Sequence, residues 1–302
     1  MRALILVLLA STAVAQGFEM ERVQLNAGAK ETWLAQTGDG LDQMQLRVAL
    51  LGHYQHRPLI LTVDGQPDGA YIGSRWTAHL LAAYGIHKFV EASVQVPVVL
   101  AQQGDDLRGY GLPAPTPTAF GALWLGVRGT FLRQRDAHPL DLGLSVNVGL
   151  PTGDAAALTR DPGAGVALAP KLGAGRAFGP VRLGVELGAL VRGATAPVIT
   201  ESTTQVGSQF NGALVVSTYD LPVHAELAAR VVAPFTAAPA SVEVTAAVRY
   251  TFLKQLELSL LGGPGIGKTP GTPAFRVLFG LAWTPDFNDR KAEAAPLATP
   301  AG

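Results

Sequence analysis

The feature that most constrains this chain is a two-residue alternation of apolar and polar side chains between residues 43 and 284. The clearest copy is residues 241–252 (SVEVTAAVRYTF), in which every even position is apolar. Successive side chains of a β-strand point to opposite faces, so such a segment has one apolar wall and one polar wall. Segments of about ten residues with this pattern, separated by turns, are typical of a barrel that spans an outer membrane.

The alternation predicts an all-β fold, a transmembrane antiparallel barrel of about twelve strands. The strands are expected near residues 43–56, 72–84, 89–101, 119–132, 139–151, 164–176, 181–192, 208–219, 223–234, 241–253, 255–263 and 272–284. Their connections alternate between short turns and longer loops, and the longer loops are expected near 57–71, 102–118, 152–163, 193–207, 235–240 and 264–271. Outer-membrane barrels have short periplasmic turns and longer extracellular loops, which indicates periplasmic chain termini here.

The N-terminus and the composition indicate an exported protein. Residues 1–15 have the basic start, apolar stretch and Ala-Val-Ala end of a cleaved signal peptide. Residues 16–42 lack alternation and are expected to form a periplasmic or lumen segment, residues 43–285 the barrel, and residues 286–302 a disordered tail. With a formal net charge of zero and no cysteine, nothing points to a nucleic-acid surface or to disulfides. The predicted location is the bacterial outer membrane.

If the apolar face of each strand meets lipid, the polar face meets the lumen. The charged and histidine side chains expected there are Arg47, Arg75, His79, Glu91, Arg128, Asp141, Lys171, Arg182, Glu186, Arg192, Glu226, Arg230, Glu243, Arg249, Glu257 and Arg276. Two interpretations stay open. The charges line a conduit for small solutes, or they form cross-strand ion pairs that fill a narrow interior.

Other patterns in the sequence give no support for catalysis, nucleotide binding or metal binding. Residues 262–269 (GGPGIGKT) match the phosphate-binding pattern G-x-x-x-x-G-K-[ST], but the prolines at 270 and 273 oppose the helix that this site needs. His53 and His56 are three residues apart with no third metal ligand evident nearby. The chain has no G-x-S-x-G motif of a hydrolase. We therefore expect no catalytic residue, no cofactor and no bound metal.

Three stretches resemble a known family. They are residues 142–154 (LGLSVNVGLPTGD), residues 248–252 (VRYTF), and residues 263–266 (GPGI) continuing through 271–273 (GTP) to 282–285 (AWTP). The chain is similar there to the N-terminal barrel region of OmpA-family outer-membrane proteins, over residues 18–286. In that family the barrel is often followed by acidic calcium-binding repeats and a peptidoglycan-binding domain. This sequence has neither after residue 285, so the resemblance supplies no tethering residues.

Together these patterns predict an outer-membrane barrel with a structural or porin-like role, passing small solutes passively and carrying out no covalent chemistry. The expected partners are outer-membrane lipid, lipopolysaccharide and the barrel-assembly machinery, without nucleic acid or nucleotide. Two alternatives come from other classes of protein. One is an outer-membrane hydrolase with a site at the outer rim, and the other is an exported soluble β-sandwich that binds a ligand.

Overall fold

The structure is a computed structural model that describes residues 17–21, 23–28, 32–63, 66–110, 112–198, 204–219, 221–253 and 255–285. The predicted signal peptide and C-terminal tail lie outside these residues. Within them, no helix has the length and apolar character needed to cross a bilayer.

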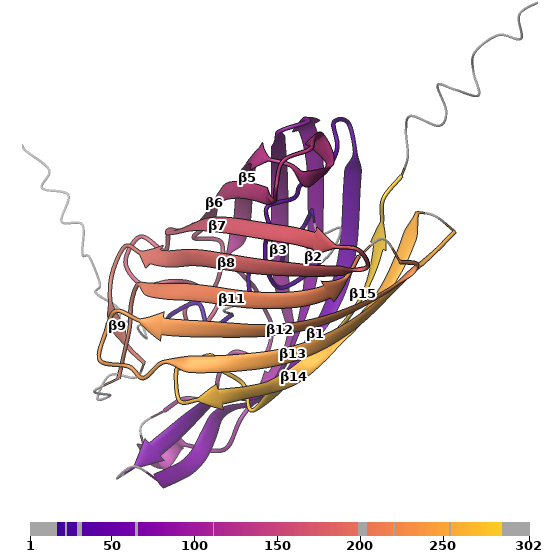
Figure 1. Cartoon of the computed structure of the whole chain (residues 1–302). Helices are drawn as coiled ribbons and strands as arrows, with labels where there is room; N and C mark the ends of the chain where they lie inside the picture. Colours follow the sequence, from indigo (N-terminus) through magenta and orange to yellow (C-terminus); the bar gives the residue numbers. More distant parts are fainter. Residues whose placement is uncertain are drawn as a thin grey trace, which may run out of the picture.

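Twelve long strands form one antiparallel sheet that closes on itself (Figure 1). They are β1 (Leu46–Val63), β2 (Gln66–His87), β3 (Val90–Gln103), β5 (Leu123–Leu132), β6 (Asp141–Leu150), β7 (Ala167–Phe178), β8 (Val181–Arg192), β11 (Gln209–Thr218), β12 (Val223–Pro234), β13 (Ser241–Phe252), β14 (Leu256–Gly267) and β15 (Phe275–Trp283). The two-residue β4 (Ala119–Phe120) pairs with β3, and β9 (Ala196–Pro197) and β10 (Gln205–Val206) form a separate ribbon.

The first and last strands close the barrel. β1 pairs with β15 from Val48 opposite Trp283 to His56 opposite Phe275, while its other edge pairs with β2. Among the described residues, no long strand is left with an open edge. A bilayer requires this closure, because unpaired backbone groups there cost several kcal/mol each. The predicted closed barrel is confirmed, and the soluble β-sandwich is excluded.

The two faces of the sheet differ as the alternation requires. On β8, Leu183 and Leu187 are exposed on the outside, whereas Arg182 and Glu186 are buried inside. The same exposed row of Val, Leu and aromatic side chains continues on the other strands. An apolar band of this kind is the surface that a transmembrane barrel presents to lipid.

Strand bounds agree with the predicted ranges closely except at two hairpins, β1–β2 and β14–β15. β8 and β12 span the predicted residues, but the predicted loops at 57–71 and 264–271 are wrong in part. β1 and β2 continue into the expected loop as a paired arm with register shifts near His56 and Leu59, and β14 extends to Gly267. Arg57 has a positive φ of 50° and Pro58 follows, so the strand bends without ending. The turn-like residues Arg57 and Pro58 therefore mark a bulge within the paired strands β1 and β2 and not the start of a loop.

The segment before β1 runs through the inside of the barrel. Its first described residue, Gly17, lies against Ala155 in the loop between β6 and β7, at the end that carries the longer loops. Its last residues, near Asp42, lie against Gly85 at the end that carries the short turns. The loop lengths indicated that the chain starts at the short-turn, periplasmic end. The described start of the chain, Gly17, lies instead at the long-loop end. We call residues 17–42, without the undescribed 22 and 29–31, the N-terminal plug.

Candidate functional site: a plugged lumen

The structure places every predicted lumen residue in the interior of the protein. Each of them is at most 8% exposed: Arg47, Arg75, His79, Glu91, Arg128, Asp141, Lys171, Arg182, Glu186, Arg192, Glu226, Arg230, Glu243, Arg249, Glu257 and Arg276. Many of these charges form ion pairs between strands. The nitrogen–oxygen distances are 2.8 Å for Arg47–Glu257, 2.7 Å for Arg182–Asp141, 2.7 Å for Arg276–Glu243, 3.6 Å for Lys171–Glu186 and 3.5 Å for Arg249–Glu257.

The wall and the plug carry opposite charge. The buried charged side chains on the described strands are nine basic and six acidic, a formal excess of three positive charges. The described residues of the N-terminal plug include four acidic residues and no lysine or arginine, a formal excess of four negative charges. The plug therefore complements the charge of the wall that surrounds it.

At the long-loop end, the plug is held by backbone and carboxylate contacts. The Glu19 amide donates to Asp161 Oδ1 over 3.1 Å, and the Met20 amide donates to the Leu158 carbonyl over 3.0 Å. Arg192 forms an ion pair with Asp161 at 2.7 Å. Phe18 and Met20 are fully buried in an apolar cluster with Leu158 and side chains of β1 and β2.

In the middle of the barrel, the plug packs on an apolar strip of the wall. The strip consists of Leu51, Leu81, Leu261 and Leu278, on β1, β2, β14 and β15. Trp33 of the plug is fully buried in the same cluster, and the Arg47 guanidinium lies 4.8 Å from its ring centroid. Burial of one large apolar side chain contributes roughly 1.5–3 kcal/mol. The alternation did not predict this strip, because it assigns only polar side chains to the lumen.

Towards the short-turn end, wall side chains bind the backbone of the plug. Glu186 accepts from the Gln36 amide over 2.7 Å, and Glu91 accepts from the Leu41 amide over 2.9 Å. Arg182 donates to the Thr37 carbonyl over 3.1 Å. Several predicted lumen charges therefore bind the plug, in addition to pairing with each other. Charge-assisted hydrogen bonds of this kind are about twice as strong as neutral ones.

Glycine allows the plug to touch the wall. A Cβ on Gly173 of β7 would lie 2.3 Å from the Gln36 carbonyl oxygen. Gly38 of the plug has φ of 88°, and a Cβ there would lie 2.7 Å from the Asp141 backbone. At these two positions any larger residue would collide with backbone, so the close approach requires glycine.

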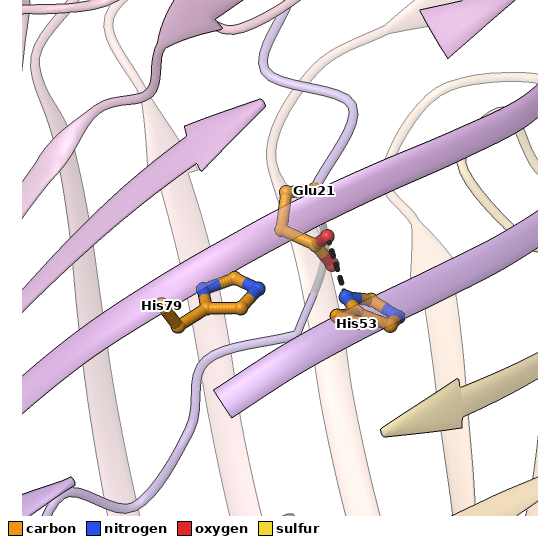
Figure 2. A group of neighbouring side chains, drawn as sticks. All are labelled: Glu21, His53 and His79. Atoms are coloured by element: carbon orange, nitrogen blue, oxygen red, sulfur yellow. Dashed lines mark ion pairs between the residues drawn. The ribbon is translucent and has the colours of Figure 1, made fainter. Parts of the chain in front are cut away.

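One buried group combines residues from the plug and the wall. Glu21 of the plug, His53 of β1 and His79 of β2 place one potential ligand atom each within 4.8 Å of one another (Figure 2). His53 Nδ1 lies 3.1 Å from Glu21 Oε2. Sequence reasoning considered His53 beside His56 and missed this group, since Glu21 lies in a segment without any pattern. The alternation could have placed His53 and His79 on one face of adjacent strands.

The long-loop end also holds a pocket of about 330 Å³. Its lining includes Arg57, Leu59, Tyr71, Lys268 and Thr269, so it combines apolar walls with basic side chains. Residues 262–267 of the phosphate-binding pattern belong to β14, and no helix begins at Lys268 in the described stretch that follows.

Solved structures of outer-membrane proteins share this architecture. An outer membrane channel from Pseudomonas putida F1 aligns with a TM-score of 0.64 at 10% identity, over 82% of this chain and 97% of that chain. The protein has the fold of an outer-membrane β-barrel. The NanC porin aligns with a TM-score of 0.51 at 6% identity, over 78% of this chain and 98% of that chain. No protein-family model matches the chain, and no curated protein sequence matches it significantly.

Proposed function

We propose that this protein is an outer-membrane channel for small solutes, closed at rest by its N-terminal plug, and that it performs no covalent chemistry. The plug is the observation that carries the proposal. It is no part of the sheet, and it is joined to the wall by side-chain contacts and by the chain that enters β1. When such a segment moves aside, the space that it leaves is bounded by the charged side chains of the strands.

The composition of the lumen supports a conduit over a purely structural barrel. An eight-stranded barrel has an interior that its own side chains can fill, and a barrel of twelve strands encloses more space. Here the interior is filled by a separate segment of opposite charge, which also covers the leucine strip. An uncovered strip of this kind next to basic side chains suits small anions that carry an apolar part.

The location and ancestry belong to the same proposal. The apolar band, the loop lengths and the signal-like residues 1–15 support export to the bacterial outer membrane, with lipid and lipopolysaccharide around the barrel and the barrel-assembly machinery inserting it. The relationship to OmpA-family barrels is proposed on the three quoted stretches alone. A homologue alignment in which those stretches recur together would test it.

A reversible cross-link between plug and wall tests the function. A Cβ at Gly184 of β8 would lie 3.2 Å from Thr37 Cβ, a few tenths of an ångström below the roughly 3.5–4.5 Å of disulfides. The chain has no cysteine of its own, so Thr37→Cys with Gly184→Cys yields one defined pair. In planar bilayers we expect the oxidised double variant to stay closed and to open after reduction with dithiothreitol.

Each single-cysteine variant is a control, and its opening should be the same under oxidising and reducing conditions. The proposal fails if the cross-linked protein opens as often as the reduced one. It also fails if the reduced protein and the wild type never conduct at any applied voltage.

A further inference from the structure

We propose that Glu21, His53 and His79 form a binding site for a divalent transition metal ion of the zinc class, which fastens the plug to the barrel wall. The site itself stands on the geometry of these three residues. Its role in keeping the channel closed rests on the proposed function.

The ligand set suits zinc. Two imidazole nitrogens and one carboxylate oxygen, with a fourth position for water, are a common zinc coordination in proteins. Ligand atoms around a tetrahedral zinc ion lie about 3.4 Å apart, given metal–ligand distances of about 2.1 Å. The three atoms here are already within 4.8 Å of one another, so small side-chain movements bring them to that spacing.

The backbone holds the three residues together. His53 on β1 is paired with Thr77 on β2, and His79 is two residues further along β2, on the same inward face. The two imidazole centroids are 5.6 Å apart. Glu21 enters from the plug, and Figure 2 shows its carboxylate directed at His53, with the His79 ring facing the same space.

Buried polar atoms at this place have no hydrogen-bond partner among the described residues. They include His79 Nε2, Thr77 Oγ1 and both side-chain amide atoms of Gln55, all in side chains at most 1% exposed. An unpaired buried polar group costs about 1–3 kcal/mol. A bound ion uses His79 Nε2, and its water offers partners to the neighbouring atoms.

The charge balance leaves Glu21 available for a cation. Arg276 Nη1 lies 3.7 Å from Glu21 Oε1, but Arg276 Nε makes a much shorter ion pair of 2.7 Å with Glu243 Oε2. Glu243 therefore compensates Arg276, and the Glu21 carboxylate is the negative charge that faces the two imidazoles.

Metal binding changes which ring nitrogens carry protons. In the structure, Gln95 Nε2 lies 3.3 Å from His79 Nδ1, and Arg276 Nη1 lies 3.2 Å from His53 Nε2. When zinc takes His79 Nε2 and His53 Nδ1, the other nitrogen of each ring carries the hydrogen. Gln95 then turns its amide so that its oxygen accepts from His79, and the Arg276 group moves towards Glu21.

This change in ring protonation gives a test that distinguishes a zinc-binding His79 from a His79 with a purely structural role. In Gln95→Glu a carboxylate can accept from both His79 Nδ1 and the Leu25 amide, which now donates to Gln95 Oε1 over 3.2 Å. Carboxylate partners of zinc-bound histidines raise ligand basicity, and their loss typically costs 10–100-fold in affinity. We therefore expect Gln95→Glu to bind zinc more tightly than the wild type.

The experiment uses the full chain without a histidine tag, refolded in detergent. Zn²⁺ binding is measured by isothermal titration calorimetry, and Co²⁺ coordination by its visible absorption spectrum. We expect one ion per chain. His79→Ala and Glu21→Gln should each lose more than the roughly 100-fold associated with an outer partner. His87→Ala, at the exposed end of the same strand as His79, should bind like the wild type.

Three results would overturn the site. They are a folded wild type that binds neither ion, equal binding by His79→Ala and wild type, and weaker zinc binding by Gln95→Glu. Heat-dependent gel mobility reports whether each variant is folded. If His79→Ala does not fold, the zinc affinity of Gln95→Glu still decides the test.

Bilayer recordings separate the site from the channel. If both proposals hold, ZnCl2 reduces opening of the wild type, EDTA restores it, and His79→Ala does not respond. A protein that binds zinc as described but never conducts retains the site and refutes the channel. A protein that conducts without any response to ZnCl2 refutes the claim that the metal ion keeps the plug on the barrel wall.

Discussion

At the scale of single residues, the environment of a side chain in this barrel depends on which face of its strand it occupies. Leu227 on β12 is 55% exposed on the outside, whereas Leu261 on β14 is 1% exposed and packs on the plug. Both are leucines in strands, yet we assign one to lipid and the other to the lumen. The difference gives a depth-dependent prediction for charged substitutions.

Leu227→Arg, near the middle of β12, should lower the free energy of unfolding by roughly 2–4 kcal/mol, because the charge would lie near the centre of the bilayer. Val223→Arg, outward at the first residue of the same strand, should cost only about 0–1 kcal/mol near the interface. Urea unfolding in lipid vesicles measures both values. Equal costs at the two positions would contradict the placement of this band in lipid.

At the scale of elements, strands were predictable and the plug was not. Strands such as β8 and β12 carry their own signal, since one face meets lipid and the other meets charged groups. Around Leu51 and Leu81 the alternation is blurred, because the inward face there packs on Trp33. The plug has no regular pattern at all, since its backbone is satisfied by wall side chains such as Glu186. For that reason its path, and Glu21 beside His53, could not be predicted from the sequence.

The contact between plug and β7 gives a prediction at this scale. Gly173→Ala places a Cβ against the Gln36 carbonyl, and backbone overlap of this kind costs roughly 1–3 kcal/mol. The plugged state should lose stability by that amount, which corresponds to an increase of about 5- to 150-fold in the open-to-plugged ratio. Single-channel recording measures the open probability. In Gly129→Ala on β5 the nearest atom to the new Cβ is 3.8 Å away, so this variant should open like the wild type.

If Gly173→Ala and Gly129→Ala opened equally often, the close approach of plug and wall would have no part in closure.

At the scale of the whole molecule, the complementary charges of wall and plug link the closed and the open state. In the closed state the acidic plug offsets the basic wall, so neither is left with a large uncompensated charge in the interior. Displacing the plug exposes a lumen with a formal excess of three positive charges on the described strands. Fixed charges in a narrow, low-dielectric passage raise the local concentration of ions of opposite sign.

The open channel should therefore prefer anions. With a KCl gradient across a planar bilayer, the reversal potential of the Gly173→Ala channel should have the sign of the chloride equilibrium potential. Lys171→Glu in the same background reduces the formal excess from three positive charges to one, and should move the reversal potential towards zero. High salt should weaken the preference, because the screening length falls from about 10 Å at 0.1 M to about 3 Å at 1 M. Potassium selectivity of the open channel would mean that the described wall charges do not line the conducting path.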